Sequence, residues 1–308
     1  MTWHRPLLWL AASMGLLTIV CAVAVFADPG VVLGAPAWLK PLKFSISVGI
    51  YALTLSWLIG QVHRMRRVAI AAGTISGIAL AIEMVIIVGA AAVGGTSHFN
   101  VSTPFNTTLW SVMAASIVVV WLMTLLVAIG LFRNPLGDPA RTLAIRAGVI
   151  LSIVGMGLAF LMTGPTAEQL DNFQGIAGAH AVGVPDGGPG LFLLGWSTIA
   201  GDLRIPHFVG MHALQALPIL LIVLELLSRR MPRLTIPTVR LRLVRVAVVA
   251  YAATVAVLTW QALAGQSIVR PAGPILVAAL AIAAATVAST IAVLVAPLPA
   301  TAALRSRV

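Results

Sequence analysis

The sequence predicts an all-α membrane protein, a bundle of about eight transmembrane helices with a long ordered loop on its outer side between the fifth and sixth helices. The chain has 308 residues, of which 60% are hydrophobic and only 9% are charged. Its mean hydropathy of +1.06 excludes an ordinary soluble domain. Apolar stretches of membrane-spanning length recur along the chain. Basic residues are concentrated in every second loop between them.

Eight apolar stretches reach the length of about 20 residues that a membrane-crossing helix needs. They are residues 7–26, 44–62, 68–93, 107–132, 142–164, 204–228, 243–264 and 273–296. We treat residues 1–308 as one integral membrane domain. The stretch 28–43 contains Pro29, Pro36 and Pro41, so we expect it to lie at the outer interface and not to form a transmembrane helix.

Basic residues define the topology. Fifteen of the 19 Lys and Arg residues lie on one side of the predicted bundle. They are Arg5, Arg64, Arg66, Arg67, Arg133, Arg141, Arg146, Arg229, Arg230, Arg233, Arg240, Arg242, Arg245, Arg305 and Arg307. The positive-inside rule makes this side cytoplasmic, and an even number of spans puts both termini there.

The net charge of +11 follows from these orienting loops. No basic run is interleaved with aromatic residues, so we expect no nucleic-acid partner. The lipid bilayer is the expected partner. Cys21 is the only cysteine, which excludes an intrachain disulfide and a thiolate metal cluster within one chain.

A polar stripe marks the predicted helix 204–228. At about 100° per residue, Arg204, His207, His212 and Gln215 fall on one side of it. Ionisable groups that face lipid are costly, so this side is expected to face the bundle or a wet cavity. Asp202 precedes the helix and suits either a helix cap or a member of the site.

Glu83 is a second polar anomaly, deep within the stretch 68–93. Its expected depth overlaps that of His212, and a buried carboxylate needs a partner. We therefore predict a Glu83–His212 pair. The alternative is a protonated Glu83 that bonds to a backbone carbonyl or to Gln215.

Four histidines fall on the outer side, and imidazole is the commonest metal ligand. We consider a metal site formed by His98, His207 and His212, and a cofactor such as haem bound near His98, His180 and Gln215. His207 and His212 differ by about 140° around a helix, so they would need a third ligand from a loop.

The segment 165–203 is a long loop that contains the turn sequence PDGGPG and several large apolar residues. Exposure of Phe192, Leu193 and Trp196 together would create an apolar patch. We therefore expect the loop to fold as an ordered lid over the outer helix ends.

The motifs GDLRIPHFVGMHALQALP, PDGGPG, GWS and SHFN resemble those of a group of uncharacterised bacterial multi-pass membrane proteins. The resemblance implies a bacterial cytoplasmic membrane and no particular activity.

Three functions remain open. The first is a membrane enzyme or redox protein with an outward-facing, lid-covered site, dependent on a metal ion or haem, with Glu83, His207, His212, Asp202 and Arg204 as its catalytic residues. The second is a transporter of a small solute or of protons, which would take its ligand from the outer side. The third is a structural or assembly protein.

Overall fold

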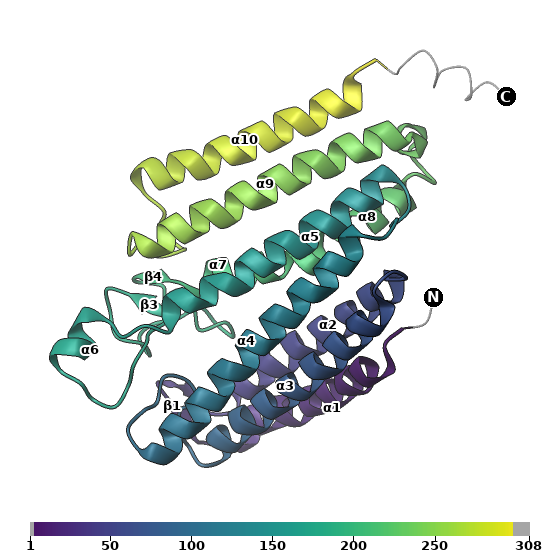
Figure 1. The fold of residues 1–308 in the computed structure, drawn as a ribbon. Helices are drawn as coiled ribbons and strands as arrows, with labels where there is room; N and C mark the ends of the chain where they lie inside the picture. Colours follow the sequence, from purple (N-terminus) through teal and green to yellow (C-terminus); the bar gives the residue numbers. More distant parts are fainter. Residues whose placement is uncertain (1–2, 298–308) are drawn as a thin grey trace.

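The computed structural model describes residues 3–297, and long helices dominate it (Figure 1). Seven of these helices are long and apolar enough to cross a membrane. Two shorter ones pass the same test only as a bent pair, which we treat as the predicted sixth of eight spans. The long helices are α1 (Arg5–Ala27), α2 (Leu39–Gln61), α3 (Arg66–Ala92), α4 (Pro104–Phe132), α5 (Pro139–Gly157), α9 (Pro237–Leu263) and α10 (Gly273–Val295). A short 3-10 helix, Leu158–Met162, continues α5. The predicted all-α, multi-pass helix bundle is confirmed.

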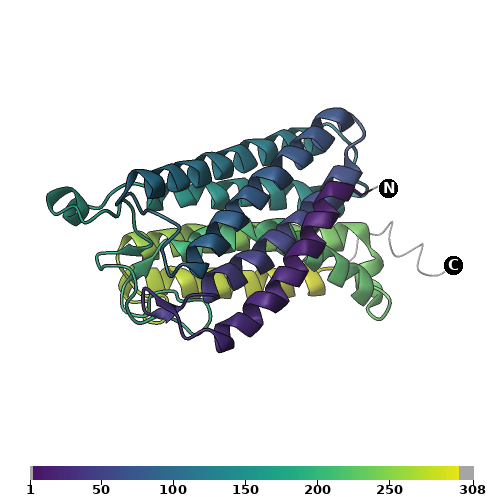
Figure 2. The same ribbon diagram turned by 90° about the horizontal axis from the view of Figure 1, so that it is seen from below.

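The helices form two neighbouring groups (Figures 1 and 2). In the first, α1 packs against α2 and α3 packs against α4. In the second, α5 contacts α7, α8 and α9, and α10 packs on α9. The beginning of α1 and the end of α10 lie at the same end of the bundle, as an even number of spans requires. Arg305 and Arg307, which contributed to the predicted topology, lie outside the described residues.

The sixth span differs from the single straight helix that we predicted. It consists of α7 (Arg204–Met211) and α8 (Ala213–Leu227), which meet at His212 with a bend of 45°. Pro218 lacks the N–H group that would bond to Leu214 one turn earlier, which weakens the helix next to the bend. The bend places the polar residues around His212 beside a break in the span.

The segment 28–43 also differs from its prediction. A two-stranded hairpin of β1 (Val31–Val32) and β2 (Ala35–Pro36) occupies its first part. Helix α2 then begins at Leu39, so Lys40 and Lys43 are helical. Pro41 is compatible with this because the N–H groups of a first helical turn have no partner inside the helix.

The loop between the fifth and sixth spans is ordered. It contains α6 (Ala167–Asp171) and the strand β3 (Ala181–Val182), which pairs with β4 (Gly201–Asp202). The expectation that its apolar residues are buried together is wrong for two of them. Phe192 is 92% exposed and Leu193 is 47% exposed, because they form the tip of a tight turn. The Gly195 N–H donates to the Leu191 carbonyl, and the Leu191 N–H donates to the Trp196 carbonyl. Trp196 packs against Phe208 of α7.

Helix α5 approaches the bent span so closely that only glycine fits at their contact. A Cβ atom on Gly155 would lie 2.2 Å from the carbonyl carbon of Gly210 in α7. Backbone atoms cannot move aside as a flexible side chain can. This contact therefore sets the spacing between α5 and α7, which carries His207.

We expect Gly155→Ala to destabilise the protein by about 1–3 kcal/mol, because the added methyl group overpacks the contact with α7. The midpoint of thermal unfolding in detergent measures the effect. Gly157→Ala is the matched control, since nothing lies within 4 Å of a Cβ at Gly157. Equal midpoints for the two variants would contradict the proposed packing.

The predicted topology gives the side of the membrane on which a reporter fused to each loop should be found. Fusions after residues 100 and 185 should report the outer compartment, and fusions after residues 66, 137 and 235 the cytoplasm, because the basic loops resist translocation. Paired alkaline phosphatase and fluorescent protein fusions measure this. An outer signal at residue 235 would contradict the topology.

Candidate functional site

A buried carboxyl group at Glu83 faces a histidine from a loop. Glu83 lies more than two turns below the outer end of α3, and it is 1% exposed. Its Oε1 atom is 3.8 Å from Nε2 of His98. Within the described part of the chain, its Oε2 atom has no hydrogen-bond partner.

The predicted Glu83–His212 pair is therefore replaced by a Glu83–His98 contact. The loop between α3 and α4 folds back into the bundle. Phe99 adopts a positive φ of 63° and is only 4% exposed, because its ring packs edge-on against Trp110 of α4. This re-entry carries the neighbouring His98 down to the level of Glu83.

Lys40 approaches the other ring nitrogen of His98. The distance from Lys40 Nζ to His98 Nδ1 is 3.0 Å, and the Ser97 hydroxyl is 3.1 Å from the same nitrogen. We assign Nδ1 as the acceptor of both groups, which puts the ring proton on Nε2. The Nε2–H group then faces Glu83. Lys40 is within hydrogen-bond distance of His98, and His98 lies 3.8 Å from Glu83. We call these three residues the Lys40–His98–Glu83 triad.

Aromatic rings surround His98. The ring centres of Phe44 and Trp110 lie 5.6 and 5.5 Å from that of His98. Burial lowers the pKa of His98 well below its ordinary value, and Lys40 and His180 in their protonated forms lower it further. His98 is therefore neutral at neutral pH, with one donor nitrogen and one acceptor nitrogen.

His180, in the loop between the fifth and sixth spans, packs against Phe99, with 4.9 Å between the ring centres. Its Nδ1 atom is 2.5 Å from Oδ2 of Asp186, which also accepts from the backbone N–H groups of His180 and Ala181. Burial raises the pKa of Asp186, but the bonds and charge of His180 and the two N–H groups outweigh it and hold the pKa at about 2. Burial lowers the pKa of His180. Asp186 is thus ionised at neutral pH and fixes the orientation of His180.

A buried ion pair anchors the end of the same loop. The Asp202 side chain is completely buried, and Arg204 donates to it from Nε at 2.9 Å and from Nη2 at 2.5 Å. Asp202 also accepts from the backbone N–H groups of Ser197 and Arg204. It is therefore more than a helix cap, because it joins the loop to α7. Lys43 of α2 donates to the carbonyl of Leu194 and ties the first helix group to the loop.

The remaining predicted residues lie at the bend of the sixth span. His207 Nδ1 is 2.8 Å from the Gly155 carbonyl, which places the ring proton on Nδ1. His212 Nδ1 is 3.1 Å from Gln215 Oε1, and Gln215 donates to Thr54 of α2. His212 Nε2 is buried, and within residues 3–297 no hydrogen-bond partner reaches it. These side chains lie at the contact between the two groups of helices.

The structure brings together some of the predicted ligands and separates others. Between residues 3 and 297, no three side chains of His, Cys, Asp or Glu converge in a geometry that can hold a metal ion. His98, His207 and His212 thus do not form the three-ligand group that the sequence suggested. His98 and His180 do share a neighbour, since the rings of both contact the ring of Phe99.

Lys40 and Lys43 were not among the residues predicted for the site. The signal that could have identified them was their position, since they are two of only four basic residues outside the loops predicted to be cytoplasmic. Their segment was treated as interfacial because of its prolines, and this hid their place on the first turns of a helix.

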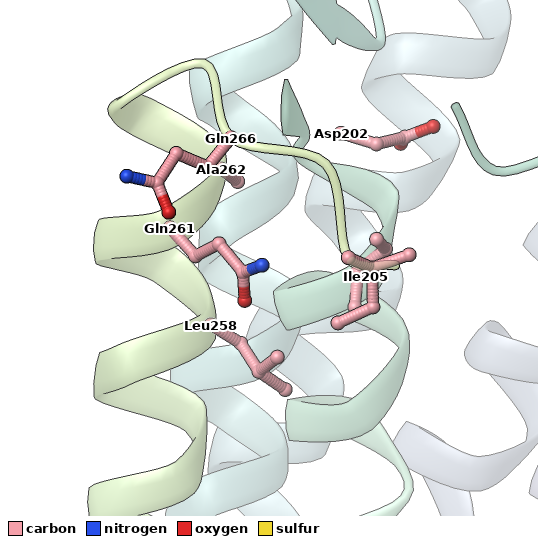
Figure 3. A pocket seen from close by; sticks show the side chains of 7 residues that line it. Asp202, Ile205, Leu258, Gln261, Ala262 and Gln266 are labelled. Carbon is pink, nitrogen blue, oxygen red and sulfur yellow. The ribbon is translucent and has the colours of Figure 1, made fainter. Parts of the chain in front are cut away.

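A small space lies behind Asp202 (Figure 3). Its lining includes Ile205 of α7, Gln261 of α9 and Gln266, and it has no room for a water-sized molecule. The Asp202 carboxylate points away from the two glutamines. We interpret this space as a packing gap between the loop and α9, and not as part of the candidate site.

Comparison of the chain with protein-family models, with curated proteins and with solved structures gives no match.

Breaking the anchor of the loop should loosen it. Arg204→Gln leaves the buried Asp202 carboxylate without its cation, which we expect to cost about 3 kcal/mol and to open residues 175–198 to protease. Limited proteolysis of the purified protein and its unfolding midpoint measure both effects. The double variant Asp202→Asn, Arg204→Gln should lose less stability than the sum of the two single variants. Arg270→Gln is the control, because Arg270 is an exposed arginine of the outer side.

Proposed function

We propose that this multi-pass membrane protein relays protons at an outward-facing, lid-covered site, and that it belongs to the class of proton-coupled transporters. The observation that carries the proposal is the Lys40–His98–Glu83 triad, in which a neutral imidazole lies between a lysine and a buried carboxyl group. We place the protein in a bacterial cytoplasmic membrane with both termini in the cytoplasm, and its small-molecule or proton ligand on the outer side.

The triad supports a balanced proton transfer. Lys40 gives one N–H proton to Nδ1 of His98, and His98 gives its Nε2 proton to Glu83. The lysine becomes a neutral amine, the carboxylate becomes a neutral acid, and His98 keeps one proton on the other nitrogen. One proton thus moves inward, and the net charge of the three groups is unchanged.

The Glu83 end of the triad needs a small movement. The 3.8 Å between Glu83 and His98 is longer than a hydrogen bond. Contacts between proton-transfer groups are often long in the resting state and shorten in the active complex. The unpartnered Oε2 of Glu83 supplies a second position for the transferred proton within the buried end of the site.

The broken sixth span supports a transport function in particular. Discontinuous helices with polar groups at their break are typical of the binding sites of secondary transporters. Here the break at His212 carries a hydrogen-bonded connection through Gln215 to Thr54 on α2, between the two helix groups. A movement of one helix group against the other would break this connection.

A membrane enzyme is the second candidate, and the His180–Asp186 pair favours it. A carboxylate that accepts from Nδ1 leaves Nε2 of the imidazole as a base or a metal ligand, as in many hydrolases and metal sites. The two candidates differ in the residues on which they depend, because the enzyme needs His180 and Asp186 whereas the relay needs Glu83.

Proton flux into liposomes that contain the purified protein tests the proposal. We expect Glu83→Gln and His98→Asn each to lower the flux of protons about 100-fold, the scale of loss when a positioned proton-transfer group is removed. The double variant should fall no lower than either single variant, because both interrupt one path. A pH-sensitive dye trapped inside the liposomes measures the flux.

Matched controls are available for both substitutions. Glu168→Gln removes an exposed carboxylate of α6, and His63→Asn removes an exposed imidazole between α2 and α3. Both should keep the flux of the unchanged protein. Equal flux in Glu83→Gln and Glu168→Gln would contradict the relay, and loss of an enzymatic activity in Asp186→Asn alone would favour the second candidate.

A further inference from the structure

A second polar site lies at the opposite end of the bundle. A cavity of about 180 Å³ opens between the first turns of α1 and α3. Both turns are at the end away from the outer loop (Figure 1). The cavity is lined by Trp3, His4, Arg5, Arg66, Ile70 and Thr74, among others. It shares no residue with the proton-relay site.

The charge of this cavity is positive. Arg5 and Arg66 line it, and the described residues of its lining include no Asp or Glu. His4 adds no charge. Its Nδ1 accepts from the Leu7 N–H group, its Nε2 is 3.1 Å from the Ile70 carbonyl, and burial lowers its pKa.

The size and position of the cavity indicate a headgroup and not a whole solute. The cavity measures about 180 Å³. Sites that enclose a whole small molecule measure roughly 300–1,000 Å³. Trp3 is 42% exposed and Ile70 is 39% exposed. A tryptophan and two arginines next to apolar helix surface are typical of the level of the lipid headgroups.

We propose that this cavity binds the phosphate headgroup of an anionic phospholipid, with Arg5 and Arg66 as its ligands. Planar guanidinium groups match two oxygens of a phosphate at once. The acyl chains lie outside the cavity, along the exposed apolar residues of α1 and α3, which include Trp9 and Val68. The cytoplasmic leaflet, which the basic loops face in the predicted topology, is the anionic one.

Native mass spectrometry of the full-length protein in neutral detergent tests the proposal. Phosphatidylglycerol and phosphatidylcholine are added at equal concentration, and inorganic phosphate is added separately. We expect the protein to retain phosphatidylglycerol in preference to phosphatidylcholine. Each of Arg5→Gln and Arg66→Gln should weaken this binding about fivefold, and the double variant should abolish the preference.

The control variant is Arg67→Gln, Arg230→Gln, which removes two exposed arginines outside the cavity and should keep the preference. Arg5→Lys, Arg66→Lys keeps the charge and should bind with intermediate strength, even if the glutamine variants fold poorly. Equal retention by the Arg5→Gln, Arg66→Gln protein and the unchanged protein would overturn the site. Full displacement of the lipid by millimolar inorganic phosphate would overturn the lipid as its ligand.

Discussion

The cost of a carboxyl group inside an apolar bundle is the constraint on which the outer half of this structure depends. Glu83 is 1% exposed, and the residues on either side of it in α3 are almost all aliphatic. A membrane offers no water to such a group, so the protein must supply its partners. It does so with a loop that re-enters the bundle and carries His98, and with a lysine from the start of α2 behind that histidine.

Each of these partners requires further structure. The re-entrant loop is held by Phe99, whose ring lies between His98, Trp110 and His180. The loop between the fifth and sixth spans holds His180 through Asp186, and it is itself anchored by the Asp202–Arg204 pair. The exposed tip at Phe192 is not part of this chain of contacts. The loop thus acts through its buried polar residues, whereas its apolar tip is turned away from the site.

Several features could be predicted because each depends on local composition. Apolar stretches long enough to span a membrane are recognised from hydropathy alone. Seven of the predicted stretches overlap α1 to α5, α9 and α10, although the helix ends differ from the predicted bounds by up to seven residues. The cost of Glu83, Arg204 and His207 facing lipid also identified the outer parts of the third and sixth spans as polar. The bend at His212 was not predictable from periodicity, since the same stripe of polar residues suits a straight helix.

The sequence by itself determined the class of the protein, its spans and which polar residues must find partners inside the bundle, because lipid imposes those requirements on every residue separately. Tertiary structure alone decided which partners they found. Glu83 meets His98 and not His212, because a positive-φ residue turns the loop into the bundle and the glycine contact between α5 and α7 fixes where the bent span lies. Lys40 joins them because a proline fits the first turn of α2. Such pairings depend on the positions of segments far apart in the chain, and hydropathy carries no information about them.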